Sequence, residues 1–415
     1  MKRFLVVTVV VLSVMLISGA ALAEELNVLY MAQAGYQPEE VRQMADVFEE
    51  IVGVEVNITF VKYDEMHDKI VTSAAVPVGT YDVVLEDLIW TAEFAEYGFV
   101  EPIDDRVNDR ILNDIPKAIL DAFRYNGKLW AMPYLANFQL FFYNEDMIKK
   151  AGFDGPPKTL EEMVEQMRVM KEKGIVEYPL VDSWNQKEGL VCEYVWLTGA
   201  FGGDTFDENG NPVFNRGPGL EALKFMKMLL DEGLANPQSL TLNENMAKDV
   251  FIAGDAAFTT NWTFQYGAMK DPEQSQVVDS GKMGLIPVAE DVLGKYKYNT
   301  ASVSGFQGAA IMANSEHKDL AWKYIRFITS PVVQRGYLVE MPVWKSVQNS
   351  AYAQSNFPTI KIKAKEIASV HHRPRVPNYQ EVSSILQRYI HQCLEGKYEP
   401  EEALDAAVKE IKNLK

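Results

Sequence analysis

Cysteine and basic side chains are scarce in this sequence of 415 residues. Its two cysteines, Cys192 and Cys393, cannot build a disulfide framework for a chain of this size, and pairing cannot be read from sequence alone, so we expect two buried thiols. The 58 acidic side chains exceed the 40 basic ones and give a formal net charge of −18. Because phosphate binding needs a basic surface, we expect no nucleic-acid partner.

Motifs of catalysis and of metal binding are also missing. The sequence contains no HExxH, GxSxG, Walker A or CxxC pattern. Of five histidines only His371 and His372 are adjacent, and neighbouring side chains on a strand point in opposite directions, which suits a metal site poorly. GPGLEA (217–222) fits a dinucleotide pattern without a buried strand before it, and FDENGNPVF (206–214) lacks the calcium-loop spacing. We therefore expect neither a metal nor a cofactor.

The one long apolar run lies at the N-terminus. Lys2 and Arg3 precede it, and it extends from Phe4 to about Ile17, which is shorter than the roughly 20 apolar residues of a membrane-spanning helix. Small residues at Ala21 and Ala23 then favour a secretory signal peptide, residues 1–23, cleaved after Ala23. No cysteine follows the cut, so we expect a lipid-free protein in the periplasm or another extracytoplasmic compartment.

Strand and helix patterns alternate after this segment. Apolar runs at 26–31, 54–61 and 81–87 predict strands, and helical spacing follows each of them, at 38–52, 64–76 and 90–98. This alternation predicts mostly parallel sheets with helices on both faces. A chain of 415 residues exceeds the size of one hydrophobic core, so we expect two domains.

Polar and aromatic residues follow two of these predicted strands. Gln33 and Tyr36 come after the first, and Asp87 and Trp90 after the third. Ligands of such sheets bind beyond the carboxyl ends of the strands, so these residues are candidates for a binding site. For Trp90 the alternative is packing beneath the helix that follows it.

Five segments, read in order, carry a family resemblance. The sequence resembles family 1 extracellular solute-binding proteins, the receptors of bacterial ABC importers for sugars, at YDVVLEDLIWTAEFAEYGFVEPID (81–104), YNGKLWAMPYLANFQLFFYNEDMIKKAGFDGPPKTLEEM (125–163), FIAGDAAFTTNWTF (251–264), GFQGAAIMANSEHKDLAWKYIRFITSPVVQ (305–334) and RPRVPNYQEVSSILQ (373–387). The resemblance implies a type II two-lobe α/β fold with the ligand cleft between the lobes. It also implies a monomer whose partners are the permease subunits of an ABC importer.

The resemblance also implies where the lobes begin and end. The N-terminal lobe is expected to comprise 24–133 plus 291–330, and the C-terminal lobe 134–290 plus 331–415. Two crossings have independent support, because Pro133 interrupts an apolar run and a proline follows Ser330 at the end of a predicted helix. The crossing near residue 290 depends on the resemblance alone.

The segment FTTNWTF (258–264) combines a large flat ring with short polar side chains. A pyranose has an apolar C–H face and a rim of hydroxyls, so Trp262 is expected to stack on the sugar and Asn261 to offer hydrogen bonds. Asp87 and Asn137 are expected to bind hydroxyls from the other lobe. The alternative for Trp262 is an ordinary place in the core.

The resemblance adds further candidates. Trp184 and Asn185 lie in a polar loop where relatives often contact ligand, although a plain surface loop is equally consistent with the sequence. Arg373 is expected either to bind sugar hydroxyls or to pair with a carboxylate across the lobes. The glycine-rich turn that could face the cleft with its backbone comprises Gly305, Phe306 and Gln307.

The sequence therefore predicts a receptor for a mono- or small oligosaccharide that makes and breaks no bond. Two alternatives stay open. One is a receptor for another solute, such as a polyamine or a metal chelate. The other is a secreted carbohydrate-active enzyme with Asp87 and Glu193 as its pair of carboxylates.

Overall fold

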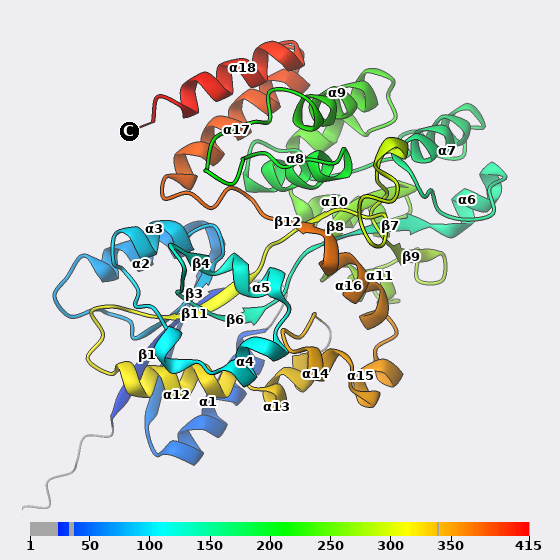
Figure 1. The fold of residues 1–415 in the computed structure, drawn as a ribbon. Helices are drawn as coiled ribbons and strands as arrows, with labels where there is room; N and C mark the ends of the chain where they lie inside the picture. Colours follow the sequence, from blue (N-terminus) through cyan, green and yellow to red (C-terminus); the bar gives the residue numbers. More distant parts are fainter. Residues whose placement is uncertain (1–23, 33–36, 338–339, 415) are drawn as a thin grey trace, which may run out of the picture.

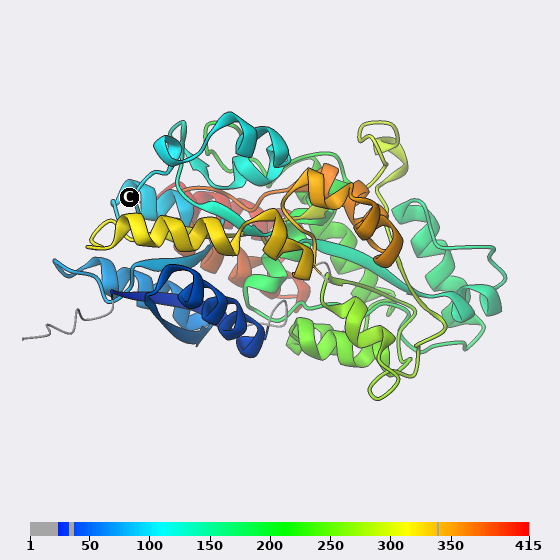
Figure 2. The ribbon, with the colours of Figure 1, turned by 90° about the horizontal axis from the view of Figure 1, so that it is seen from below.

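The chain forms two lobes, each built on its own β-sheet (Figure 1). This computed structural model describes residues 24–32, 37–337 and 340–414. The predicted signal peptide, Gln33 and Tyr36 lie outside the described residues. Seen from below, the lobes lie end to end, and the segment that contains β7 (Gln139–Asn144) leads from one lobe into the other (Figure 2). The two-lobed α/β architecture predicted from the sequence is thus present.

The first lobe contains a five-stranded sheet, and β2, β1 and β3 are parallel neighbours in it. Helix α1 (Pro38–Val52) and helix α12 (Lys318–Ile328) cover one face, where the rings of Phe48 and Tyr324 meet edge-on at 5.1 Å between centroids, and α2 (Tyr63–Ala74) covers the other (Figure 1). The strands, in spatial order, are β2 (Glu55–Lys62), β1 (Glu25–Ala32), β3 (Val83–Asp87), β11 (Gln307–Ile311) and β6 (Met132–Leu135).

The second lobe contains a three-stranded sheet in the order β8-β7-β9. Its strands β8 (Phe258–Trp262) and β9 (Gly281–Gly284) both pair antiparallel with β7. The expected parallel pairing is thus found among β1, β2 and β3 but not in this second sheet. Strand β7 leads into the second lobe and β8 runs back in the opposite direction, so the two strands pair antiparallel. The longer helices of this lobe are α7 (Leu160–Glu172), α8 (Glu188–Ala200), α9 (Pro218–Asp231), α10 (Glu244–Ile252), α17 (Tyr379–Leu394) and α18 (Pro400–Ile411).

Short elements complete the fold. The short strands are β4 (Arg124–Tyr125), β5 (Lys128–Leu129), β10 (Ser302–Val303) and β12 (Val370–His371). The short helices are α3 (Thr91–Glu96), α4 (Asp109–Asp114), α5 (Lys117–Ala122), α6 (Glu145–Ala151), α11 (Gln265–Lys270), α13 (Pro331–Gln334), α14 (Lys345–Gln348), α15 (Ala351–Asn356) and α16 (Ile360–Glu366).

Three segments lie side by side where the lobes meet. The backbone N–H of Gly305 donates to the carbonyl of Asn137 at 2.9 Å, and that of Ser304 donates to the carbonyl of His371 at 3.0 Å. Strand β10 also pairs with β12. Backbone bonds therefore join the three connections between the lobes into one narrow ribbon.

The residues before this ribbon contact the second lobe. The Tyr296 hydroxyl donates to the carbonyl of Gly199 in α8 at 2.8 Å, and Val303 packs in the same core as α8. The lobe boundaries derived from the resemblance remain a prediction.

Both cysteines are buried free thiols, as expected from the sequence. Burial raises the pKa of the Cys393 thiol to about 12, so it stays protonated at neutral pH. Among the helices of the described residues, none is long and apolar enough to cross a bilayer.

Strand β3 carries a buried carboxyl at Glu86. Its Oε1 accepts a hydrogen bond from the Thr91 hydroxyl at 2.6 Å, while Oε2 has no hydrogen-bond partner among the described residues. Burial disfavours the charged form and raises the pKa of Glu86 from 4.5 to about 8. The folded protein therefore holds a proton here at neutral pH.

We predict that Glu86→Gln weakens the loss of stability between about pH 5 and pH 8. The pKa of Glu86 is raised in the folded state, so its contribution to the free energy of unfolding is complete below pH 4.5. This contribution falls as pH rises towards 8, by at most about 5 kcal/mol. Glutamine resembles the protonated form of the side chain but cannot ionise, so the variant lacks this pH-dependent loss of stability. A plot of melting temperature against pH should be flatter for Glu86→Gln than for the wild-type protein, whereas Glu50→Gln, at an exposed position, should follow the wild-type plot. Identical plots for all three proteins would contradict the assignment.

Candidate functional site

A cavity of about 420 Å³ lies between the two lobes. The first lobe contributes residues at the ends of its strands or directly after them, namely Ala32, Tyr63, Asp64 and Asp87, together with Gln307 at the start of β11. The ribbon between the lobes contributes Asn137, Gly305 and Arg373. The remaining wall comes from Asn185, Lys187, Glu188, Gly189, Cys192, Asn243, Glu244, Asn245, Trp262, Phe264 and Glu340. Elements far apart in the sequence thus converge on one cavity.

An ion-pair bridge between the lobes lines this cavity. Arg373 is only 2% exposed, and its Nη2 lies 2.7 Å from Asp87 Oδ1 while its Nη1 lies 2.9 Å from Glu188 Oε1. Asp87 ends β3 in the first lobe, and Glu188 begins α8 in the second. Burial acts to lower the pKa of Arg373, but the two carboxylates outweigh it and raise that pKa well above its usual range. One guanidinium therefore neutralises a carboxylate from each lobe.

Hydroxyl groups fix both carboxylates of the bridge. The Tyr63 hydroxyl donates to Asp87 Oδ2 at 3.0 Å, and the backbone N–H of Ile89 donates to Oδ1 at 3.3 Å. Tyr379 and Ser383 of α17 donate their hydroxyls to the two oxygens of Glu188. These bonds hold the two carboxylates in place.

Trp262 forms one wall of the cavity at the end of β8. A Cβ atom on Gly305 would lie 2.7 Å from Cζ3 of the indole, so only glycine at 305 lets the ribbon approach the ring this closely. Burial raises the pKa of the neighbouring Glu244 carboxyl, and the side chain of Trp262 opposes this shift. The ring is half-buried, with its packing side on the core of the second lobe. Its position is set from two sides.

Asn137 is held at the wall by its own contacts. Its carbonyl accepts from the Gly305 N–H, and its Oδ1 accepts from the Thr263 hydroxyl at 2.8 Å. Thr263 also bonds the buried carboxyl of Glu340. Burial raises the pKa of Glu340, an effect that buried Lys363 opposes.

Four expected contact residues do not reach the cavity. Trp90 is 2% exposed and packs between Tyr63, at 5.5 Å, and Phe94 of the following helix, at 6.1 Å between ring centroids. Phe306 is fully buried in the hydrophobic core of the first lobe. Side chains point alternately to opposite sides along an extended segment, so Phe306 points away from the cavity that its neighbours line. The side-chain amide of Asn261 donates to the backbone carbonyl of Glu244, and its Oδ1 accepts from the backbone N–H of Trp262.

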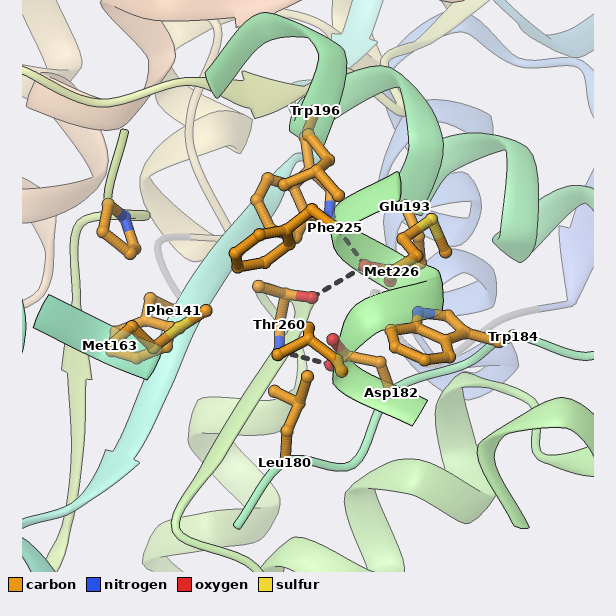
Figure 3. Close-up of a pocket in the computed structure, with 13 residues that line it drawn as sticks. Phe141, Met163, Leu180, Asp182, Trp184, Glu193, Trp196, Phe225, Met226 and Thr260 are labelled. Carbon is orange, nitrogen blue, oxygen red and sulfur yellow. Dashed lines mark hydrogen bonds between the residues drawn. The ribbon is translucent and has the colours of Figure 1, made fainter. Parts of the chain in front are cut away.

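Trp184, the fourth, lines a separate cavity inside the second lobe, which holds only about 20 Å³ (Figure 3). Two buried carboxyls, Asp182 and Glu193, lie there on either side of Thr260. The Trp196 indole donates to Glu193 Oε2 at 2.6 Å, and burial raises the pKa of Glu193 to about 7. This cavity has room for a water molecule and not for a sugar.

The carboxylate pair of the enzyme hypothesis is therefore not assembled. Asp87 lines the cavity between the lobes, whereas Glu193 lines the one inside the second lobe. A glycosidase needs both carboxyls on one bond. Among the described residues, no group of three or more His, Cys, Asp and Glu side chains is arranged to hold a metal ion.

Comparison with known proteins identifies this arrangement. The sequence profile of the bacterial extracellular solute-binding proteins matches residues 34–335. The chain belongs to this family. As a solute-binding protein it is similar to the maltose-bound MalE3 of T. maritima, with a TM-score of 0.82, 27% identity, and coverage of 94% of this chain and 99% of that one. The resemblance read from the five segments is confirmed.

Two further relatives extend the comparison. A maltotriose-binding protein of Pyrococcus abyssi is 25% identical over 366 residues, which cover 86% of this chain and 76% of that protein. An ABC transporter solute-binding protein of Agrobacterium radiobacter K84, solved with ribitol, has a TM-score of 0.82 at 24% identity and covers 95% of this chain and 100% of that one. The second of these supports the two-lobe fold alone.

The structure brings seven of the expected residues of this solute-binding protein to the cavity between the lobes: Asp87, Asn137, Asn185, Trp262, Gly305, Gln307 and Arg373. Their contact with a ligand remains a prediction. Sequence reasoning missed Tyr63, although it directly follows strand β2 and the carboxyl-end rule applies to it. Glu188 and Glu244 carried a weaker signal, since each begins a helix next to a polar loop.

We predict that Arg373→Met destabilises the solute-binding protein by about 3 to 5 kcal/mol, because it leaves Asp87 and Glu188 without their cation. The matched control is Arg168→Met. Arg168 makes a bidentate contact with Glu232 at 2.7 and 2.8 Å on the surface, and its loss should cost less than about 1 kcal/mol. Urea unfolding of both variants measures the difference, and equal losses would refute a special role for the bridge.

Proposed function

We propose that this solute-binding protein is an extracytoplasmic carbohydrate receptor that closes around a sugar and delivers it to a membrane ABC importer. The observation that carries the proposal is the position of Trp262 beside polar side chains from both lobes in one cavity. An indole ring matches the apolar face of a sugar, and the surrounding carboxylates and amides match its hydroxyls.

The relatives support a carbohydrate ligand. The structure of T. maritima MalE3 contains maltose, and the P. abyssi relative is a maltotriose-binding protein. Sugar hydroxyls both donate and accept hydrogen bonds, so a receptor needs acceptors as well as donors. Asp87 and Glu188 supply acceptor oxygens, and the amides of Asn137 and Asn185 supply both kinds of group.

The proposed role involves binding without chemistry. Asp87 and Glu188 are both held by Arg373, so neither is poised as a general acid, and Glu193 is out of reach. Delivery instead requires motion of the lobes about the ribbon that joins them. Because Tyr296 bonds α8 and Val303 packs in the second-lobe core, we propose that the middle crossing lies at Ser304 rather than near residue 290, with the other boundaries as expected from the sequence.

Transport from outside the cytoplasm requires export. We propose that residues 1–23 direct export and are cleaved after Ala23, and that the mature monomer meets the permease subunits of its importer. The family itself consists of extracellular solute-binding proteins, which supports this compartment.

A thermal-shift screen of the mature protein against sugars, polyols and polyamines tests the proposal. A ligand that binds only the native state must raise the melting temperature. We expect the largest shift from a carbohydrate. If only polyamines raised the melting temperature, the ligand would be a cationic solute and not a sugar. If no carbohydrate raised it, the proposal would be refuted.

We predict that Trp262→Ala weakens sugar binding by roughly 1 to 3 kcal/mol, as loss of aromatic stacking does in other ligand sites. Stability should fall much less than the roughly 3 to 5 kcal/mol typical of a buried tryptophan. The matched control is Trp322→Ala, which removes another half-buried tryptophan far from the cavity and should leave affinity unchanged. Calorimetric titration of the best screening ligand decides; unaltered affinity in Trp262→Ala would exclude the stacking role.

A further inference from the structure

We infer that the preferred ligand of the cavity between the lobes is a carbohydrate with a protonated amino group, and that Glu244 is the carboxyl that binds this ammonium group. The inference rests on the proposed carbohydrate receptor and names the class of its ligand. Three observations carry it: the balance of charge around the cavity, the surroundings of Glu244, and the ring and amides that complete the lining.

Acidic side chains outnumber basic ones around the cavity. The carboxyls in its lining are those of Asp64, Asp87, Glu188, Glu244 and Glu340, and the cations are those of Lys187 and Arg373. The undescribed internal residues, 33–36 and 338–339, contain no side chain that is charged at neutral pH, so they do not alter this balance. A ligand with a positive charge would complement the acidic lining, whereas a neutral sugar would not.

Both cations of the lining are already paired. Arg373 lies between Asp87 and Glu188, with nitrogen–oxygen distances of 2.7 and 2.9 Å. Lys187 Nζ lies 3.8 Å from Asp64 Oδ2. These two groups together contain three carboxylates and two cations, so no positive charge is left over for the other carboxyls of the lining.

Glu244 is the carboxyl of the lining that lacks a cation. The buried carboxyl of Glu340 has the charge of Lys363 nearby, which opposes the effect of burial on its pKa. Glu244 forms no ion pair with any Lys, Arg or His side chain in the described part of the chain. Burial raises the pKa of Glu244, and the neighbouring carboxylates of Glu188 and Asp64 raise it further. An ammonium group beside Glu244 would relieve this repulsion and stabilise its charged form.

The chain makes room for the Glu244 carboxyl beside an aromatic ring. A Cβ atom on Gly189 would lie 2.7 Å from Oε1 of Glu244, so a glycine in the first turn of α8 lets the carboxyl approach this helix. The side chain of Trp262 opposes the raised pKa of Glu244, and both residues line the cavity. The face of an indole ring attracts a cation within about 6 Å of its centre, so the ring and the carboxylate together suit an ammonium group.

The amides of the lining indicate that the ligand also carries hydroxyls. The asparagines that line the cavity are Asn137, Asn185, Asn243 and Asn245. Oδ1 of Asn137 already accepts a hydrogen bond from Thr263, so its amide N–H groups are what it can offer a ligand. An amide N–H needs an acceptor, which a hydroxyl provides and an ammonium group does not. The lining therefore fits a sugar with an amino group better than a polyamine, which has no hydroxyl.

Matched pairs of sugars test the inference. The mature protein is titrated by calorimetry at neutral pH with glucosamine and glucose, with galactosamine and galactose, and with a glucosamine disaccharide and cellobiose. In the pair that binds best, the amino sugar should bind about tenfold more tightly than its neutral counterpart, or better. Amino sugars that bind no more tightly than their neutral counterparts in every pair would overturn the ammonium site and leave the carbohydrate receptor intact. Binding of no carbohydrate of either kind would instead overturn the receptor itself.

A variant of Glu244 tests its assignment within the best-binding pair. Glu244→Gln keeps the shape of the side chain and removes its charge, so affinity for the amino sugar should fall about tenfold while affinity for the neutral sugar changes little. The control is Glu65→Gln, which removes the same charge at an exposed position of α2 outside the cavity and should keep the preference. A preference that survives in Glu244→Gln, or an equal loss of affinity for both sugars, would refute Glu244 as the ammonium-binding carboxyl.

Discussion

The arrangement of the site depends on one guanidinium. Arg373 is almost fully buried and yet faces two carboxylates, one from each lobe. A buried charge is tolerated only when partners and hydrogen bonds surround it, and here Asp87 and Glu188 provide them. The same bonds that neutralise Arg373 fix the end of β3 against the start of α8. The ion pairs that compensate the buried charge of Arg373 therefore also set the position of one lobe relative to the other.

The neighbouring ribbon gives this bridge its geometry. Its three segments are tied by backbone bonds, and Gly305 brings one of them directly against the ring of Trp262. Asn137 is fixed on the same ribbon by Thr263. The ring that is proposed to stack on a sugar thus lies against the part of the chain about which the lobes would move.

Much of this organisation was predictable, because it is encoded locally. Alternation of strands and helices placed Asp87 at a strand end, and the polar setting of Trp262 marked it as unusual. Trp90 and Trp184 were harder to place, since the burial of a ring depends on what packs over it, and here Tyr63 and the second-lobe core do so. The antiparallel second sheet also eluded prediction, because strand direction is set by partners distant in sequence.

Glu188 illustrates what local patterns cannot reveal: nothing near it in sequence indicates a partner 185 positions away at Arg373. The most direct test of the whole account is a crystal structure of the mature protein grown with its best-binding carbohydrate. The account predicts a sugar ring within about 4 Å of the Trp262 ring, with hydroxyls bonded to side chains of both lobes. A ligand bound elsewhere, with this cavity empty, would contradict it.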